Sequence, residues 1–154
     1  MAENLNYDAN GSRCYKNNAD SCAKYGRLYN WETALTACPA GTHLPTDKEW
    51  TTLVNYVGDS STAGKKLKST SGWNWNDYKG KSGNGTNDYG FSALSSGVGY
   101  DGEFIDVGNS GLWWSATGLG EDYVWGRGIN YNFEFVNRYG LRKTDLFSVR
   151  CVAD

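Results

Sequence analysis

The chain has 154 residues, which suits a single domain, and its 39% hydrophobic and 21% charged residues are ordinary for a globular protein. Its net charge of −2 provides no positive field for a phosphate backbone, and no stretch reaches the roughly 18 apolar residues of a membrane span, so neither nucleic acid nor direct membrane insertion is expected. Twenty glycines against two prolines, with 15% aromatic residues, favour a turn-rich β or α+β chain over a helical bundle.

Helices are expected in the first half of the chain. Residues 31–38 favour a short helix that ends before a proline. Residues 46–57 give the clearest pattern, because Thr46 and Glu49 match a capping box and apolar residues then recur at helical spacing. Residues 62–68 are expected to form a third, brief helix.

Strands are expected from residue 69 onward, where Gly, Asn, Ser and Asp clusters separate short apolar runs. Residues 1–154 are therefore interpreted as one α+β domain in which helices precede an antiparallel sheet. The predicted strands are Gly90–Leu94, Phe104–Val107, Leu112–Ser115, an alternating segment over Tyr123–Arg138 and a closing strand over Phe147–Val152.

The four cysteines favour two disulfides, because their number is even and no C-x-x-C pair suggests a zinc site. Cys14 and Cys22 bracket a loop too polar to order itself, which predicts that they pair with each other. Cys38 and Cys151 then join a helix to the last strand and stabilise the fold by about 4 kcal/mol. Disulfides imply an oxidising compartment. The alternative is four reduced, buried thiols in a cytosolic protein.

Catalytic residues are not assigned. The one histidine, His43, precedes the second helix and is expected to hold that turn, and no nucleophile motif occurs. A carboxylate pair such as Glu103 with Asp106 is the alternative for an enzyme. No cofactor and no metal ligand are assigned, although the oxygen-rich loop over residues 73–88 makes Ca²⁺ a candidate. That loop lacks EF-hand spacing, and its Asn and Asp residues also suit turns.

Aromatic residues interleaved with Asn and Gly predict a recognition surface for a protein or a glycan. Four tryptophans at positions 31, 50, 113 and 125 are assigned to the core. Period-two alternation places residues 125, 127, 129 and 131 on the packed face and leaves an open face where two glycines give a partner room. The predicted ligand-binding residues are Trp73, Trp75, Gly126, Gly128, Asn130, Asn132, Phe133, Glu134, Phe135, Asn137 and Tyr139.

Several unusual motifs occur in an order that resembles the Fibrobacter succinogenes major paralogous domain family over essentially the whole chain. The resemblance implies an extracellular module of a bacterial surface protein, with adhesion the usual suggestion. In that family a strand normally precedes the first motif, so this chain is expected to be trimmed at its N-terminus. The motifs are Met1–Tyr7, Tyr25–Trp31, Cys38–Trp50, Asn87–Leu94, Trp113–Thr117 and Phe147–Cys151.

Two of these motifs, Leu44–Trp50 and Phe147–Cys151, are also similar to elements of formylglycine-generating enzymes, whose fold elaborates the C-type-lectin-like one. This similarity implies two helices packed on small twisted antiparallel sheets with long ordered loops. Sugar-binding C-type lectins also join a first-helix cysteine to a last-strand cysteine, but their Glu-Pro-Asn calcium motif is missing here. Related domains are scaffolds for sequences diversified by retroelements, which would display ligand residues on the C-terminal sheet.

The leading hypothesis is therefore an extracellular or cell-surface bacterial module that binds a protein or glycan ligand. It is expected to be a monomer or part of a larger chain. The alternatives are an enzyme on a formylglycine-generating-enzyme-like fold and a structural spacer domain.

Overall fold

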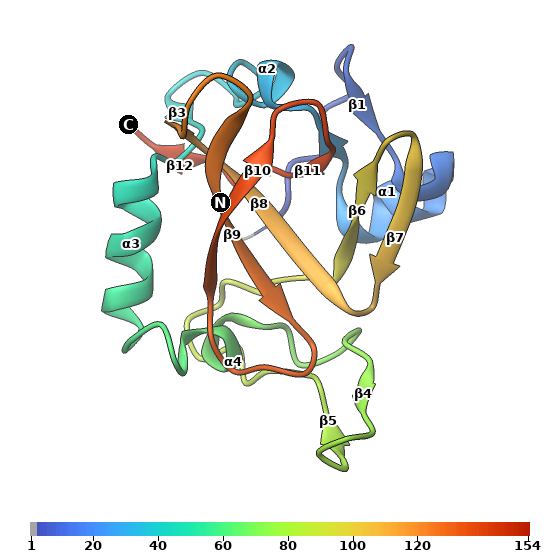
Figure 1. Cartoon of the computed structure of the whole chain (residues 1–154), viewed down its shortest axis with the longest axis vertical. Helices are drawn as coiled ribbons and strands as arrows, with labels where there is room; N and C mark the ends of the chain where they lie inside the picture. The colour runs from blue at the N-terminus through green and yellow to red at the C-terminus, as the bar shows by residue number, and fades with distance from the viewer. Residues whose placement is uncertain (1–2) are drawn as a thin grey trace.

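The structure is a computed structural model that describes residues 3–154, so Met1 and Ala2 of the first motif lie outside it. Figure 1 shows a curled sheet with α3 (Asp47–Tyr56) on one side and α1 (Ala19–Tyr25) on the other, which confirms the α+β prediction. The remaining helices of the described chain are η1 (Tyr15–Asn17), α2 (Trp31–Ala34) and α4 (Ala63–Leu67).

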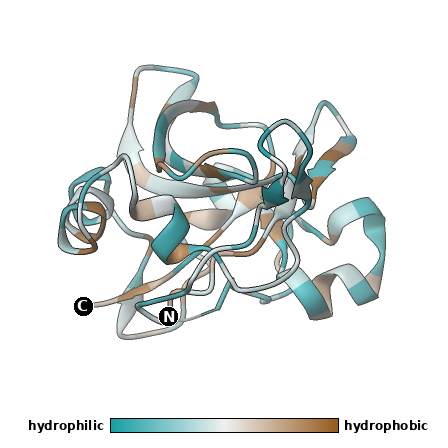
Figure 2. Ribbon diagram, turned by 90° about the horizontal axis from the view of Figure 1, so that it is seen from below, coloured by the Kyte–Doolittle hydropathy of each residue, from teal (hydrophilic) through white to brown (hydrophobic). Residues whose placement is uncertain are grey.

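The α3 helix begins as its sequence predicts. The Glu49 N–H donates to the Thr46 side chain, and the Glu49 carboxylate accepts the Thr46 N–H at 2.8 Å, which completes the capping box. Trp50 and Val54 are buried on one face of the helix. Helices are banded in hydrophilic and hydrophobic colours in Figure 2, as expected for elements with a single apolar face.

Two helical predictions need correction. The α2 helix ends at Ala34 rather than at residue 38, because its last turn tightens and the Thr36 N–H donates to the Thr33 carbonyl. The segment between Cys14 and Cys22, expected to be a polar loop, instead contains η1 and the start of α1. The Asn18 side chain accepts the Asp20 N–H and so caps α1.

The central sheet runs in the order β1-β2-β11-β8-β6-β7, with β9 paired to β8 and β10 paired to β9. Most pairs are antiparallel, but β8 is parallel to both β6 and β11. Two small sheets, β3 with β12 and β4 with β5, complete the fold. The strands are β1 (Ser12–Arg13), β2 (Leu28–Tyr29), β3 (Thr42–His43), β4 (Trp75–Asn76), β5 (Lys81–Ser82), β6 (Ser96–Tyr100), β7 (Glu103–Val107), β8 (Ser110–Gly118), β9 (Tyr123–Asn130), β10 (Asn137–Arg142), β11 (Phe147–Ser148) and β12 (Val152–Ala153).

The predicted strands match this sheet unevenly. The strand at Phe104–Val107 is confirmed as β7, and the one at Leu112–Ser115 is the middle of the longer β8. The prediction at Gly90–Leu94 is wrong, because that segment is a loop with one isolated bridge. The alternating segment 123–138 is a hairpin of β9 and β10 rather than one strand, and 147–152 is divided between β11 and β12.

Adjacent tryptophans on β8 fill the two sides of the sheet. Trp114 lies in a core cluster with Val124, Leu141 and Phe147, whereas Trp113 lies in a second cluster with residues of α3 and α4. Both rings are fully buried, because successive side chains of a strand point to opposite faces and both faces are covered.

The predicted core tryptophans are confirmed at Trp50 and Trp113, which are buried. Trp31 is only partly buried and packs against the first cluster. Trp125 is also half-buried, because the Arg138 guanidinium covers it with its central carbon 3.4 Å from the ring centroid.

The structure contains the two predicted disulfides, Cys14–Cys22 and Cys38–Cys151. The second joins the segment after α2 to the end of the chain. The N-terminal segment lies beside that end as well, since the Leu5 N–H donates to the Val149 carbonyl. The C-terminal segment is therefore held by one disulfide, to Cys38, and by one backbone hydrogen bond, to Leu5.

Candidate functional site

The open face predicted for β9 is not open. Gly126 and Gly128 are both buried. A Cβ atom at Gly126 would collide with the Leu141 side chain, and one at Gly128 would collide with the ring of Tyr139. These glycines therefore make room for neighbours on β10, and the prediction that they leave open space for a partner is wrong.

Register explains this result. Gly126 pairs with Trp114 on β8 and with Tyr139 on β10, so these residues share one face of the sheet. On that face, Trp114 belongs to the first core cluster and the Tyr139 ring covers Gly128. The opposite face carries Arg127 and Ile129, which are buried as predicted. A strand in the middle of a sheet with both faces covered has no ligand-facing side.

The other predicted residues divide into two groups. Asn132, Phe133, Glu134 and Phe135 lie in the turn between β9 and β10, and Trp75 lies on the β4–β5 hairpin. Figure 1 shows this turn passing α4 at the end of the molecule from which the hairpin projects. The turn therefore meets two earlier segments, α4 and the β4–β5 hairpin, which are both distant from it in sequence.

Trp73 does not join this group as an exposed ring. Its side chain is buried in the second core cluster, and its indole N–H donates to Ser69 and to the Ala93 carbonyl. The prediction of exposure at Trp73 is wrong, because its polar sequence neighbours concealed a packed position. Trp75, two residues on, is 57% exposed as predicted.

A pocket of about 220 Å³ lies where the three segments meet, and we call it the Phe133 pocket. The hairpin side supplies Lys81 together with small and amide residues, α4 and its C-cap supply two more lysines, and the turn supplies aromatic and polar side chains. Its lining residues are Lys65, Lys68, Lys81, Ser82, Gly83, Asn84, Tyr131, Asn132, Phe133 and Glu134.

Lys68 anchors the turn to α4. Its ammonium group donates to the carbonyls of Asn130 at 3.1 Å and Phe133 at 2.9 Å, although the residue is only 2% exposed. Burial lowers the pKa of Lys68 to about 8, against the opposing influence of the Glu134 carboxylate. Lys68 is therefore mostly protonated at neutral pH and holds a positive charge at the base of the pocket.

Phe133 lines the pocket and is supported by a second ring outside it. Phe133 and Phe135 stack with centroids 4.6 Å apart, and Phe133 is 40% exposed. Glu134, between them, accepts a 2.6 Å hydrogen bond from Lys81 of the hairpin, which lowers the pKa of Glu134. The prediction that Phe133 is exposed at a turn is confirmed.

The rest of the predicted site lies outside this pocket. Asn137 and Tyr139 are on β10, where the Asn137 side chain donates to the Tyr139 hydroxyl at 2.6 Å. Tyr139 is exposed but covers Gly128. Asn130 bonds to Ser110 within the sheet. These side chains are occupied by contacts within the sheet.

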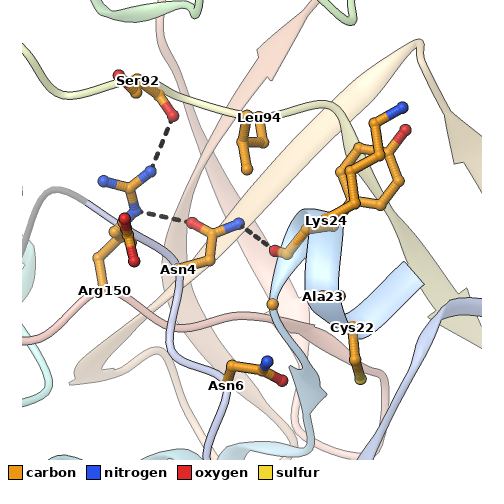
Figure 3. A pocket seen from close by; sticks show the side chains of 11 residues that line it. Asn4, Asn6, Cys22, Ala23, Lys24, Ser92, Leu94 and Arg150 are labelled. Atoms are coloured by element: carbon orange, nitrogen blue, oxygen red, sulfur yellow. Dashed lines mark hydrogen bonds between the residues drawn. The ribbon is translucent and has the colours of Figure 1, made fainter. Parts of the chain in front are cut away.

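The larger pocket in Figure 3 has a different character. It measures about 420 Å³, and Arg150 and Asn4 lie within it. Arg150 donates to Asn4 and to the carbonyls of Phe91 and Ser92, while Asn4 donates to the Tyr25 carbonyl. These polar groups hold the N-terminal segment against the end of the chain, which indicates a structural role.

The residues that could bind a metal ion or act in catalysis form no evident site in the structure of residues 3–154. Within residues 3–154, no group of three or more His, Cys, Asp or Glu side chains could hold a metal ion. Glu103 and Asp106 are both exposed on β7. His43 bonds to Glu49 at 2.9 Å and to Asp154 at 2.7 Å, so it fixes the turn before α3 as expected. None of the helices in the described chain is long and apolar enough to cross a membrane.

The sequence analysis missed the lysines of the Phe133 pocket. Lys65, Lys68 and Lys81 come from segments at least fifty residues before the turn, and separately they match solvated polar positions. The available signal was local charge, since five lysines occur between residues 65 and 81 of a chain with net charge −2.

A family model described as the Fibrobacter succinogenes major domain matches residues 1–153 of the chain. Neither the curated proteins nor the solved structures include a match.

Proposed function

The chain belongs to the Fibrobacter succinogenes major domain family, and from this premise we propose that it is a ligand-binding or adhesion module of a bacterial surface or secreted protein. The Phe133 pocket is the observation that carries the proposal. It combines exposed aromatic surface with charged and amide groups on ordered turns, which is the composition of many recognition sites. The ligand class is a protein or a glycan.

Extracellular location is part of the proposal. Both disulfides need an oxidising compartment to form and persist, and together they use all four cysteines. Free thiols in protein purified without reductant would contradict this location.

An array screen tests the function. The folded domain is applied to glycan and protein arrays, and each ligand found is tested again with Phe133→Ala and with Tyr56→Ala. Tyr56 is a matched control, because it is an aromatic residue 75% exposed on α3, away from the pocket. Loss of binding in Phe133→Ala alone supports the proposal, and a fall of about 2 kcal/mol or more in binding free energy is typical of an anchor residue.

Three other results would contradict it. Absence of any ligand would favour the spacer alternative, and chemical conversion of a bound ligand would favour an enzyme. Equal binding by Phe133→Ala and the unmodified domain would move the site elsewhere.

We also propose that the fold is C-type-lectin-like. The Cys38–Cys151 disulfide, which ties the segment after a helix to the end of the chain, supports this proposal. A crystal structure that superposes on C-type lectin domains over the helices and central sheet would support it, and a different chain order through that sheet would refute it.

Retroelement diversification is proposed from the same family likeness. Sequencing the coding region in a growing bacterial population tests it. Substitutions concentrated in the codons of residues 130–139 would support diversification, and an even distribution would contradict it.

A further inference from the structure

Positive charge accumulates around the Phe133 pocket. Lys65, Lys68 and Lys81 line the pocket, and Lys79 joins Lys65 and Lys81 in lowering the pKa of Lys68. Glu134 is the acid that opposes them, and Lys81 already binds it at 2.6 Å. The five side chains together carry a surplus of positive charge on a chain whose net charge is negative. An anionic group is the natural complement of such a site.

Two polar groups at the pocket have no complete set of partners. The ammonium of Lys68 has three N–H groups, and two of them donate to backbone carbonyls. Its third N–H donates to no oxygen or nitrogen acceptor among residues 3–154, although the Nζ atom lies 5.3 Å from the centroid of the Trp73 ring. The side-chain oxygen Oδ1 of Asn132 is buried and has no donor in the same part of the chain. Unmet hydrogen bonds at buried groups are costly, so a ligand that supplies both an acceptor and a donor would be favoured.

The rim adds an apolar requirement. The Phe133 ring stacks on Phe135, the Nζ atom of Lys79 lies 5.9 Å from its centroid, and the ring stays 40% exposed beside the pocket. A flat, ordered ring offers a face on which the apolar side of another ring can lie. The complement therefore has an anionic group, a hydroxyl donor and one flat apolar face.

From these requirements we propose that the Phe133 pocket binds one acidic sugar, a hexuronate unit of a polysaccharide. Its carboxylate would lie against Lys65 and Lys68, a hydroxyl would donate to Asn132, and the sugar ring would face Phe133. The proposal rests on the ligand-binding function above and names the ligand class.

The shape of the pocket favours a sugar over an acidic peptide. Its volume of about 220 Å³ is below the roughly 300–1,000 Å³ of sites for drug-sized ligands, which suits a single ring. Extended peptides are bound along a sheet edge or a long groove. The Phe133 pocket is instead enclosed by a hairpin, a short helix and a turn.

The test is an NMR titration of the ¹⁵N-labelled domain with three probes: methyl glucuronide, its neutral counterpart methyl glucoside, and a polyglutamate peptide. Methyl glucuronide is expected to shift the amide signals of residues 131–134 and to bind at least about tenfold more tightly than the glucoside, equivalent to about 1.4 kcal/mol. Polyglutamate is expected to leave these signals unchanged.

Lysine variants test which side chains bind the carboxylate of the sugar. Lys65→Gln removes a half-exposed lysine and is expected to weaken glucuronide binding several-fold, whereas Lys48→Gln on α3 is the matched control and leaves it unchanged. Lys68→Met is expected to abolish the preference for the acidic sugar. Because Lys68 is buried, the NMR spectrum of the Lys68→Met variant is first compared with that of the unmodified domain. If the fold has changed, the Lys65→Gln variant alone decides whether the lysines bind the carboxylate.

Equal affinity for both sugars, or the absence of shifts at residues 131–134 with any probe, overturns the acidic-sugar proposal. Tighter binding of polyglutamate overturns it in favour of an acidic protein. The broader function can survive all three results, since a neutral array ligand that depends on Phe133 would still establish a binding module.

Discussion

Replacing Asp47 with Asn tests how α3 is fastened to the strands that carry the β9–β10 turn. The Asp47 carboxylate lies between two guanidinium groups, 2.5 Å from Arg127 and 2.8 Å from Arg138. The Arg127 side chain is 5% exposed, so the substitution leaves a buried cation without its counter-charge. We expect Asp47→Asn to destabilise the fold.

The magnitude follows from burial. Removing one partner of a fully buried ion pair costs roughly 3–5 kcal/mol. The cost is smaller here, about 2–3 kcal/mol, because Arg127 keeps hydrogen bonds to the Asp47 carbonyl and to Thr51, and the asparagine oxygen can still accept one. For a domain of this length that corresponds to a fall of about 4–12 °C in Tm. Arg138→Gln is the control, since its half-exposed pair is worth about 1 kcal/mol or less.

Urea denaturation as a function of pH is the assay. Burial raises the pKa of Asp47, but hydrogen bonds from Arg138 and Arg127 outweigh it and hold that pKa below its ordinary value of 3.8. A depressed carboxylate pKa contributes stability above the unfolded-state pKa and loses it as the pH falls through the folded-state value. The difference between the unmodified domain and Asp47→Asn should therefore be complete at neutral pH and shrink in strong acid.

Two results would refute this reasoning. One is an Asp47→Asn variant as stable at pH 7 as the unmodified domain. The other is a stability difference that stays constant down to the acid limit, because a protonated Asp47 and an asparagine have nearly the same shape and no charge.

Three further predictions concern stability. Denaturation of the Cys38→Ala, Cys151→Ala double variant should show a loss of about 4–5 kcal/mol for a bridge spanning 113 residues, and a loss below 1 kcal/mol would contradict the chain-entropy argument. Trp73→Ala should cost about 3–5 kcal/mol and exposed Trp75→Ala less than about 1 kcal/mol, an order that equal thermal shifts would refute. The pKa of Lys68 is lower in the folded state than in the unfolded chain, so the free energy of unfolding should rise by on the order of 1–3 kcal/mol from pH 8 toward 10.5. Lys68→Met should abolish that rise, and a Lys68→Met variant that kept it would contradict the prediction.

Local signals made part of the fold predictable. The capping box at Thr46 and Glu49 depends on residues three apart, so α3 could be placed almost to the residue. The Cys14–Cys22 disulfide was also local, with a separation of 8 residues. The alternation over 123–138 gave the correct packed face for Ile129, because period two is a property of the strand itself.

The remaining errors concern tertiary partners. Gly126 and Gly128 suggested open space, but a missing side chain is filled by whichever neighbour the register supplies, here Leu141 and Tyr139. Trp73 has polar neighbours in sequence and apolar neighbours in space. Sequence period alone does not reveal what covers each face of a strand.

The turn residues of the Phe133 pocket could be predicted from the sequence, but the residues that only the fold brings to them could not. Composition indicated Asn132, Phe133 and Glu134, because aromatic and amide residues at a turn favour recognition. Lys65 and Lys68 could not be assigned to them, since α4 is brought to the turn by tertiary contacts: the Lys68 side chain donates to two carbonyls there, and the Lys65 N–H donates to the Glu134 carbonyl.

The most direct test of the central claim is the position of the site, mapped by NMR amide shifts when the domain is mixed with a ligand identified on the arrays. Our account predicts that the largest shifts fall at residues 131–134, 65–68 and 81–84, which surround the Phe133 pocket. Shifts centred on the Arg150 pocket or on β10, with the signals of residues 131–134 unmoved, would contradict it.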